Sequence, residues 1–213
     1  MKKIRSNNQH YDAWLHWDVT KRCNLNCEYC FGKITDPKVV VNLIDIEKLI
    51  ATLDKTDKVF RISFTGGEPT MVPNFVEALN AITEKHFISF NTNLITKNLT
   101  KIIDAVDPQR ILHIHASLHY DELVKKNLLE RFIENFKLFK KNGFNIFTEV
   151  VAYPPLVDRI YEMKSILESE GIDITFAPFF GKLNDKIYPD AYTEKELELF
   201  GISENELQCF SQK

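Results

Sequence analysis

The stretch VFRISFTGGEPTMVPNFVEALNAITEKHFISFNT, residues 59–92, holds a strand, a helix and a second strand in chain order. Residues 59–65 form an apolar, β-branched run, and residues 87–92 form another. Between them, residues 73–85 carry apolar side chains at helical spacing, with a proline in the first turn. This order is typical of a parallel sheet in which helices connect neighbouring strands.

The same alternation continues on both sides of this stretch. The sequence predicts further strands at residues 13–19, 111–118, 145–151 and 172–179. It predicts helices at residues 45–54, 98–106, 121–142, 156–170 and near 193–200. Asp45 is the expected N-cap of the first of these, and Gly143 and Gly171 are the expected ends of two others. We therefore predict an α/β fold with six parallel strands, as an open sheet or a partly closed barrel, whose functional residues lie at the carboxyl ends of the strands.

Length and composition suit one globular domain with a sizeable core, since 44 % of the 213 residues are hydrophobic and 27 % are charged. The formal net charge of −3 provides no positive field that would indicate binding to nucleic acid or to an anionic membrane. The amino-terminal stretch lacks the apolar core of a signal peptide, and no run of about 18 apolar residues could span a bilayer. We expect a cytoplasmic protein, in which clustered cysteines are metal ligands rather than disulfides.

Three of the four cysteines lie within KRCNLNCEYC, residues 21–30, directly after the first predicted strand. The three are Cys23, Cys27 and Cys30. The loop is polar, which argues against buried, inert cysteines, and thiolates suit either zinc or an iron–sulfur cluster. Structural zinc would need a fourth ligand, for which His16 and the remote Cys209 are candidates. A [4Fe–4S] cluster would instead keep one iron free of protein ligands, as a catalytic metal requires.

The pattern C-x3-C-x2-C after a first strand, with Tyr29 before its last cysteine, resembles the signature of the radical S-adenosylmethionine (radical SAM) enzymes. The resemblance implies that the three cysteines hold a [4Fe–4S] cluster and that S-adenosylmethionine chelates its free iron. It further implies reductive cleavage to a 5′-deoxyadenosyl radical, which removes a hydrogen atom from the substrate. An electron donor such as flavodoxin or ferredoxin would supply the electron.

Polar motifs at the ends of the next strands support this resemblance. Thr65 to Pro69, TGGEP, resembles the family's GGE segment, where glycines allow a close backbone approach and Glu68 could accept hydrogen bonds from the methionine ammonium. Asn91-Thr92-Asn93 resembles a family motif that usually continues with glycine, here replaced by Leu94. The resemblance implies these cofactor-binding residues: Tyr29, Gly66, Gly67, Glu68, Asn91, Asn93, Ser117, Arg131, Val151 and Phe176.

The resemblance covers roughly residues 12–180 and implies a partial (β/α)6 barrel. We expect a lead-in at 1–12, the barrel at 13–182 and a carboxyl-terminal segment at 183–213 that could begin a longer extension containing Cys209. The chain is most similar to peptide- and protein-modifying members that carry such a cysteine-rich (SPASM-type) extension. A peptide is therefore the expected substrate, and a small molecule or nucleoside is the alternative.

Other interpretations of the same residues stay open on sequence alone. An electron carrier without substrate chemistry, or a zinc-stabilised binding module, would also use clustered cysteines. His113 and His115 share one strand face and His119 follows, which allows a metal site, a general base or ordinary packing. Glu149 lies among apolar residues, which suggests either a position inside the barrel or a solvent-facing one.

Overall fold

The structure is a computed structural model that describes residues 10–30, 39–203, 205 and 207. Its centre is a six-stranded sheet whose strand order follows the chain. The strands are β1 (Ala13–Thr20), β2 (Phe60–Gly66), β3 (Phe87–Thr92), β4 (Ile111–Ser117), β5 (Ile146–Ala152) and β6 (Ile174–Pro178). All neighbouring pairs are parallel. The predicted α/β class with six parallel strands is therefore confirmed.

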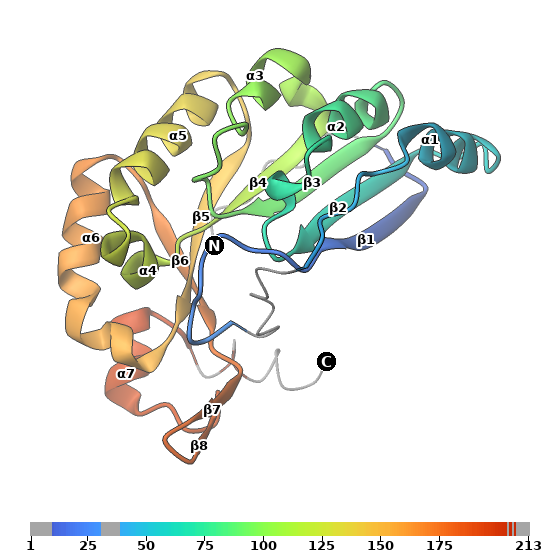
Figure 1. Cartoon of the computed structure of the whole chain (residues 1–213). Coiled ribbons are helices and arrows are strands. Elements are labelled where there is room, and N and C mark those ends of the chain that lie inside the picture. The colour runs from blue at the N-terminus through green and yellow to red at the C-terminus, as the bar shows by residue number, and fades with distance from the viewer. Residues whose placement is uncertain (1–9, 31–38, 204, 206, 208–213) are drawn as a thin grey trace.

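Helices connect the strands and cover one face of the sheet, which bends into an open arc (Figure 1). They are α1 (Ile46–Asp54), α2 (Phe75–Thr83), α3 (Lys101–Ala105), α4 (Tyr120–Lys125), α5 (Leu129–Lys141) and α6 (Ile160–Ser169). Among the described strands, β1 and β6 are the two edges and do not pair with each other, so the barrel is partial. No helix in the described part of the chain is long and apolar enough to cross a membrane.

The two faces of the sheet differ because successive side chains of a strand point to opposite sides. Ile62, Phe64, Ile88 and Phe90 are at most 1 % exposed and belong to the core beneath the helices. The opposite, concave face is polar. There, Ser63 accepts a hydrogen bond from Trp14 Nε1 at 2.8 Å and shares another with Ser89 at 2.7 Å, and further along lie His115 and Glu149.

The capping residues predicted from the sequence lie at the ends of their helices. The Asp45 side chain accepts from Lys48 N at 3.0 Å, which confirms the expected cap, and Gly143 and Gly171 adopt φ of +83° and +69° just after their helices. The single helix expected at 121–142 is wrong, because Asn127 takes a left-handed conformation (φ +55°) that ends α4 before α5 begins. The helix expected at 156–170 begins instead as a 3-10 helix, Pro154–Arg159, that continues into α6.

The sequence did not predict the small hairpin that follows the barrel. It consists of β7 (Gly181–Leu183) and β8 (Lys186–Tyr188), paired antiparallel. Asn184 and Asp185 form its turn with φ of +48° and +62°, the two positive values of a type I′ turn. The expected helix near 193–200 is α7 (Glu194–Phe200), closed at its start by a capping box between Thr193 and Glu196. Cys209 lies outside the described residues.

Candidate functional site

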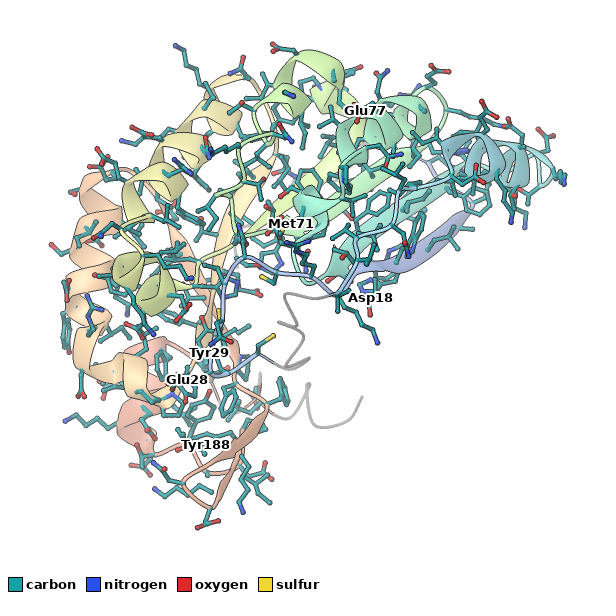
Figure 2. The ribbon with its side chains drawn as sticks, viewed as in Figure 1. Asp18, Glu28, Tyr29, Met71, Glu77 and Tyr188 are labelled. Carbon is teal, nitrogen blue, oxygen red and sulfur yellow. The ribbon has the colours of Figure 1, made fainter. Side chains whose placement is uncertain are left out.

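The carboxyl ends of the strands and the cysteine loop surround a hollow of about 510 Å³. Eleven of the residues expected at the site line it. They are Cys23, Cys27, Tyr29, Cys30, Gly66, Gly67, Glu68, Asn91, Asn93, Ser117 and Val151. Figure 2 shows Glu28 and Tyr29 of the loop near each other, on the same side of the arc as Tyr188 of the hairpin. Segments far apart in the sequence thus meet at the edge of a parallel sheet where ligands are usually bound.

The Gly66-Gly67 segment holds the cysteine loop in place. Gly67 N donates to Thr20 O at 2.7 Å, and Glu68 N donates to Arg22 O at 2.8 Å. A Cβ at Gly66 would lie 2.2 Å from Thr20 O, and one at Gly67 would lie 2.2 Å from Arg22 O. The close approach that these glycines permit is therefore to the backbone that leads into the cysteines.

Glu68 connects β2 to the end of β3. Its side chain is 1 % exposed, and its Oε1 accepts from Thr70 N, Thr70 Oγ1 and Thr92 Oγ1 at 3.2, 2.5 and 2.8 Å. Its Oε2 accepts from Asn93 N at 2.7 Å. Burial raises the pKa of Glu68, while these donors act in the opposite direction. Because the Glu68 carboxylate accepts four hydrogen bonds from the chain itself, its role at the hollow is to fix the positions of the backbone around it.

The three cysteines are free thiols. Burial raises the pKa of Cys23 to about 11 and that of Cys27 to about 12, and nearby anionic groups add to both shifts. Thiols in such surroundings lose their protons when a metal centre binds them. In the described part of the chain, no three Cys, His, Asp or Glu residues are placed to hold a single metal ion. Cys23, Cys27 and Cys30 come from one loop and all line the hollow, a donor set that suits a cluster in which each cysteine binds a different iron.

Asn93 connects the end of β3 to the cysteine loop. Its Nδ2 donates to Asn24 Oδ1 at 2.7 Å and lies 3.9 Å from the sulfur of Cys23. Leu94, which stands where the resembling motif usually has glycine, has φ of +57° and is fully buried. The backbone here adopts a left-handed conformation that glycine favours, although the residue is leucine.

Tyr29 and His119 form a pair that was not predicted from the sequence. The Tyr29 hydroxyl lies 3.0 Å from His119 Nδ1, and the two rings stack with centroids 5.9 Å apart. The Tyr29 ring also contacts Tyr153, with centroids 5.0 Å apart. Burial, with a smaller contribution from His115, lowers the pKa of His119 to about 4, so its imidazole is neutral at pH 7. His119 thereby fixes the aromatic side chain of the cysteine motif against the end of β4.

Two residues expected at the site are not brought to it. Arg131 is exposed on α5, beside the buried Phe132 that packs this helix onto the outer face of the sheet. Phe176 points to the opposite side of β6, where its ring contacts Phe200 with centroids 5.2 Å apart and Lys164 lies over it. Neither residue lines the hollow.

Other lining residues were missed by the sequence analysis. Pro178, Phe179 and Phe180 line the hollow at the end of β6, where Phe176 was expected to bind the cofactor. Asp18 also lines it, from the concave face of β1. The sequence contained a pattern that could have predicted this position of Asp18. His16, Asp18 and Thr20 are polar at every second position of an otherwise apolar strand, which indicates a face turned away from the core.

The family model of the Radical SAM superfamily matches residues 17–165, more than half of the chain. The chain therefore belongs to the radical SAM superfamily, whose cofactors are a [4Fe–4S] cluster and S-adenosylmethionine. The cysteine loop and the strand ends that line the hollow lie within the matched residues, apart from the end of β6.

The sequence identity to individual proteins of known function or structure is low. GTP 3′,8-cyclase of Synechocystis sp. is 25 % identical over 174 residues, covering 76 % of this chain and 52 % of the cyclase. 7-Carboxy-7-deazaguanine synthase of Clostridium acetobutylicum is 25 % identical, covering 82 % of this chain and 77 % of the synthase. The structure of Streptococcus suis SuiB bound to S-adenosylmethionine superposes with a TM-score of 0.61 and 20 % identity, over 94 % of this chain and 48 % of SuiB. That likeness concerns the fold, and the chain spans about half the length of the cyclase and of SuiB.

Proposed function

We propose that the chain acts as a radical SAM enzyme that removes a hydrogen atom from a peptide or protein substrate. The convergence of three free cysteines with the GGE segment and the end of β3 on one hollow carries this proposal. When bound, the cluster supplies the electron that cleaves S-adenosylmethionine to methionine and a 5′-deoxyadenosyl radical. An external reductant such as flavodoxin or ferredoxin would provide that electron.

The chain's own residues would perform three tasks. Cys23, Cys27 and Cys30 would each hold one iron. Backbone groups around Gly67 and Asn93, fixed by the Glu68 carboxylate, would line the place of the methionine part. Val151 and the aromatic residues after β6 would cover the apolar part of S-adenosylmethionine and limit the access of water, which would otherwise reach a reactive radical.

The test is anaerobic. The protein is reconstituted with iron and sulfide, reduced with dithionite and given S-adenosylmethionine, and 5′-deoxyadenosine is quantified. We expect a brown protein that forms 5′-deoxyadenosine. A colourless protein that retains zinc, or a brown protein that does not bind S-adenosylmethionine, would contradict the proposal and favour the binding module or the electron carrier respectively.

The assignment of the three cysteines as cluster ligands can be tested with the variant Cys27→Ala. It should lose the brown absorbance and all formation of 5′-deoxyadenosine, because one iron loses its ligand, while far-UV circular dichroism stays unchanged. Cys209→Ala, which removes a thiol outside the motif, serves as the control and should retain both. Cleavage that survives in Cys27→Ala would show that the three ligands are wrongly assigned.

The peptide substrate is supported by the open arc. Because β1 and β6 do not pair with each other in the described part of the chain, the sheet remains an open arc (Figure 1), and an open concave face would suit an extended chain. SuiB, which shares the fold, has been solved with its precursor peptide SuiA. The names of the two curated relatives favour a second candidate, a nucleotide or deazaguanine-type small molecule.

These two substrate classes can be separated by isotope transfer. The reconstituted enzyme is incubated with the peptide fraction or the small-molecule fraction of cells grown in deuterated medium. Hydrogen abstraction from a labelled substrate places deuterium in 5′-deoxyadenosine, which mass spectrometry detects. Enrichment with the peptide fraction supports the proposal. Enrichment confined to the small-molecule fraction, or to added deuterated GTP as the reference nucleotide, would support the second candidate instead.

A further inference from the structure

The concave face carries a contact between a histidine and a carboxylate that the proposed cofactor chemistry does not use. His115 Nε2 lies 3.2 Å from Glu149 Oε1, and the two side chains are 18 % and 33 % exposed. Strands of parallel sheets are usually apolar on both faces. Placing two ionisable groups there costs desolvation that their attraction does not reliably offset. Stability is thus a weak explanation for this pair.

The register of the strands places Glu149 next to the hollow. Glu149 pairs with Ser117 of β4 on one side and with Thr175 of β6 on the other. Ser117 lines the hollow, and so does Val151, two residues further along β5 on the same face. Glu149 therefore lies one step along the strand from the residues that line the hollow.

His115 fixes the direction of the carboxylate and leaves one oxygen available. The imidazole stacks on Phe147, with centroids 5.0 Å apart and an interplanar angle of 16°, and so holds its Nε2 toward Glu149 Oε1. Among the residues the structure describes, His115 is the partner of this carboxylate. Arg61, a cation on the same face, lies over the Trp14 ring at 4.7 Å. Glu149 Oε2 thus remains an acceptor on the concave side.

We propose that Glu149 binds a cationic group of the substrate, a primary amine or a guanidinium, and that His115 positions its carboxylate for this contact. The assignment rests on the proposed function, because it places the substrate on the concave face beside the hollow. Hydrogen bonds between a carboxylate and a cation are stronger than those between neutral groups, so the contact selects substrates with a lysine, an arginine or a free amino group there.

Binding can be tested without the cluster. The full chain is prepared with ¹³C-labelled histidine, and the Cε1–H signal of His115, assigned from its loss in His115→Gln, is followed by NMR during titration with Nα-acetyl-lysine amide. We expect a saturable shift in the wild type and in Glu134→Gln, a matched loss of charge at an exposed position of α5. The shift should vanish in Glu149→Gln and with Nα,Nε-diacetyl-lysine amide, which has no charge. An unmoved His115 signal, or an equal shift in Glu149→Gln or with the neutral probe, would overturn the assignment.

Turnover provides a second test with a different readout. Glu149→Gln should raise the half-saturating amount of the deuterium-donating substrate fraction by about tenfold or more. Substrate-independent formation of 5′-deoxyadenosine and the affinity for S-adenosylmethionine should remain within about twofold of the wild type. His115→Leu should behave similarly, and His115→Gln, which keeps a donor near Oε1, should restore most of the affinity. An equal loss of substrate-independent cleavage would show that the pair only supports the fold. A wild type that cleaves no S-adenosylmethionine contradicts the proposed function, whereas the NMR result still decides the assignment of Glu149.

Discussion

Leu94 occupies a left-handed backbone position, with φ of +57°, directly after Asn93. A residue with a Cβ is strained there by about 1–2 kcal/mol. Two features offset this strain: the side chain is fully buried in the core, and the Leu94 carbonyl accepts from Asn135 Nδ2 at 2.6 Å. Packing thus allows a leucine where the backbone alone would favour glycine.

Replacing Leu94 by glycine should destabilise the protein despite relieving this strain. Removing a buried leucine side chain costs about 2–5 kcal/mol, more than the strain released. Urea unfolding should therefore show a lower midpoint. The control is Asp57→Gly, at an exposed position with φ of +51°, which should leave the protein equally or more stable. A stabilised Leu94→Gly would show that strain outweighs packing at this position.

Glu68 shows how a buried carboxylate beside the hollow can fix the surrounding backbone. In Glu68→Ala, the donors from Thr70, Thr92 and Asn93 lose their acceptor in a buried place, which should cost about 3 kcal/mol or more in the free energy of unfolding. We expect weaker binding of S-adenosylmethionine, measured by equilibrium dialysis, with the cluster absorbance retained. A variant that binds S-adenosylmethionine normally but loses the cluster would assign Glu68 to the cluster instead.

Most residues that line the hollow could be predicted, because parallel strands bring their carboxyl ends together. The prediction failed where a side chain had to be assigned to one face. In strand β6, Ile174 and Phe176 alternate with the exposed Thr175, so the pattern places Phe176 on the core side with Phe200; the prediction followed the family position and not this alternation. Arg131 was placed by analogy, although Phe132, Phe136 and Phe139 define the buried stripe of α5 and leave Arg131 outside it.

Among the elements, the contact between the GGE segment and the end of β1 positions the backbone that enters the first cysteine. Gly67→Ala would bring a Cβ to 2.2 Å from Arg22 O, so the loop must move. Such overpacking costs about 1–3 kcal/mol. We expect lower thermal stability together with less iron retained after reconstitution, measured by iron analysis.

Gly143→Ala is the matched control. Gly143 has φ of +83° and nothing within 4 Å of the position where a Cβ would be added, so alanine introduces backbone strain without a clash. This variant should lose about 1–2 kcal/mol of stability and retain a full complement of iron. Equal iron loss in both variants would mean that global stability, rather than the position of the loop, determines cluster retention.

Strands were predicted more accurately than helix interruptions. The strand at 87–92 was predicted with the bounds that the structure shows, because its apolar run is closed by polar residues on both sides. The break at Asn127 was missed because apolar spacing continues from α4 into α5. The β7–β8 hairpin could have been found from Asn184-Asp185, a pair that suits a turn with two positive φ values.

For the whole molecule, backbone hydrogen bonds within the chain attach the cysteine loop to the core scaffold. The core lies between the sheet and its helices, and the cysteine loop is attached to that scaffold through Thr20 and Arg22. Protein stripped of iron by a chelator should therefore keep its far-UV circular dichroism and slow hydrogen exchange at the amides of Gly67 and Glu68. Rapid exchange of these two amides in the stripped protein would show that the metal organises the loop.

The attachment of the cysteine loop to the GGE segment also affects how the protein survives exposure to air. If oxygen destroyed a cluster bound there, backbone hydrogen bonds to Thr20 and Arg22 would still hold the backbone that enters Cys23. The entropy of ordering residues 20–23 is lost once, during folding, and not again at each reloading. Loss of the cluster would then be reversible. A cell could rebuild it on the existing chain by delivering new iron and sulfide, without synthesising a new chain.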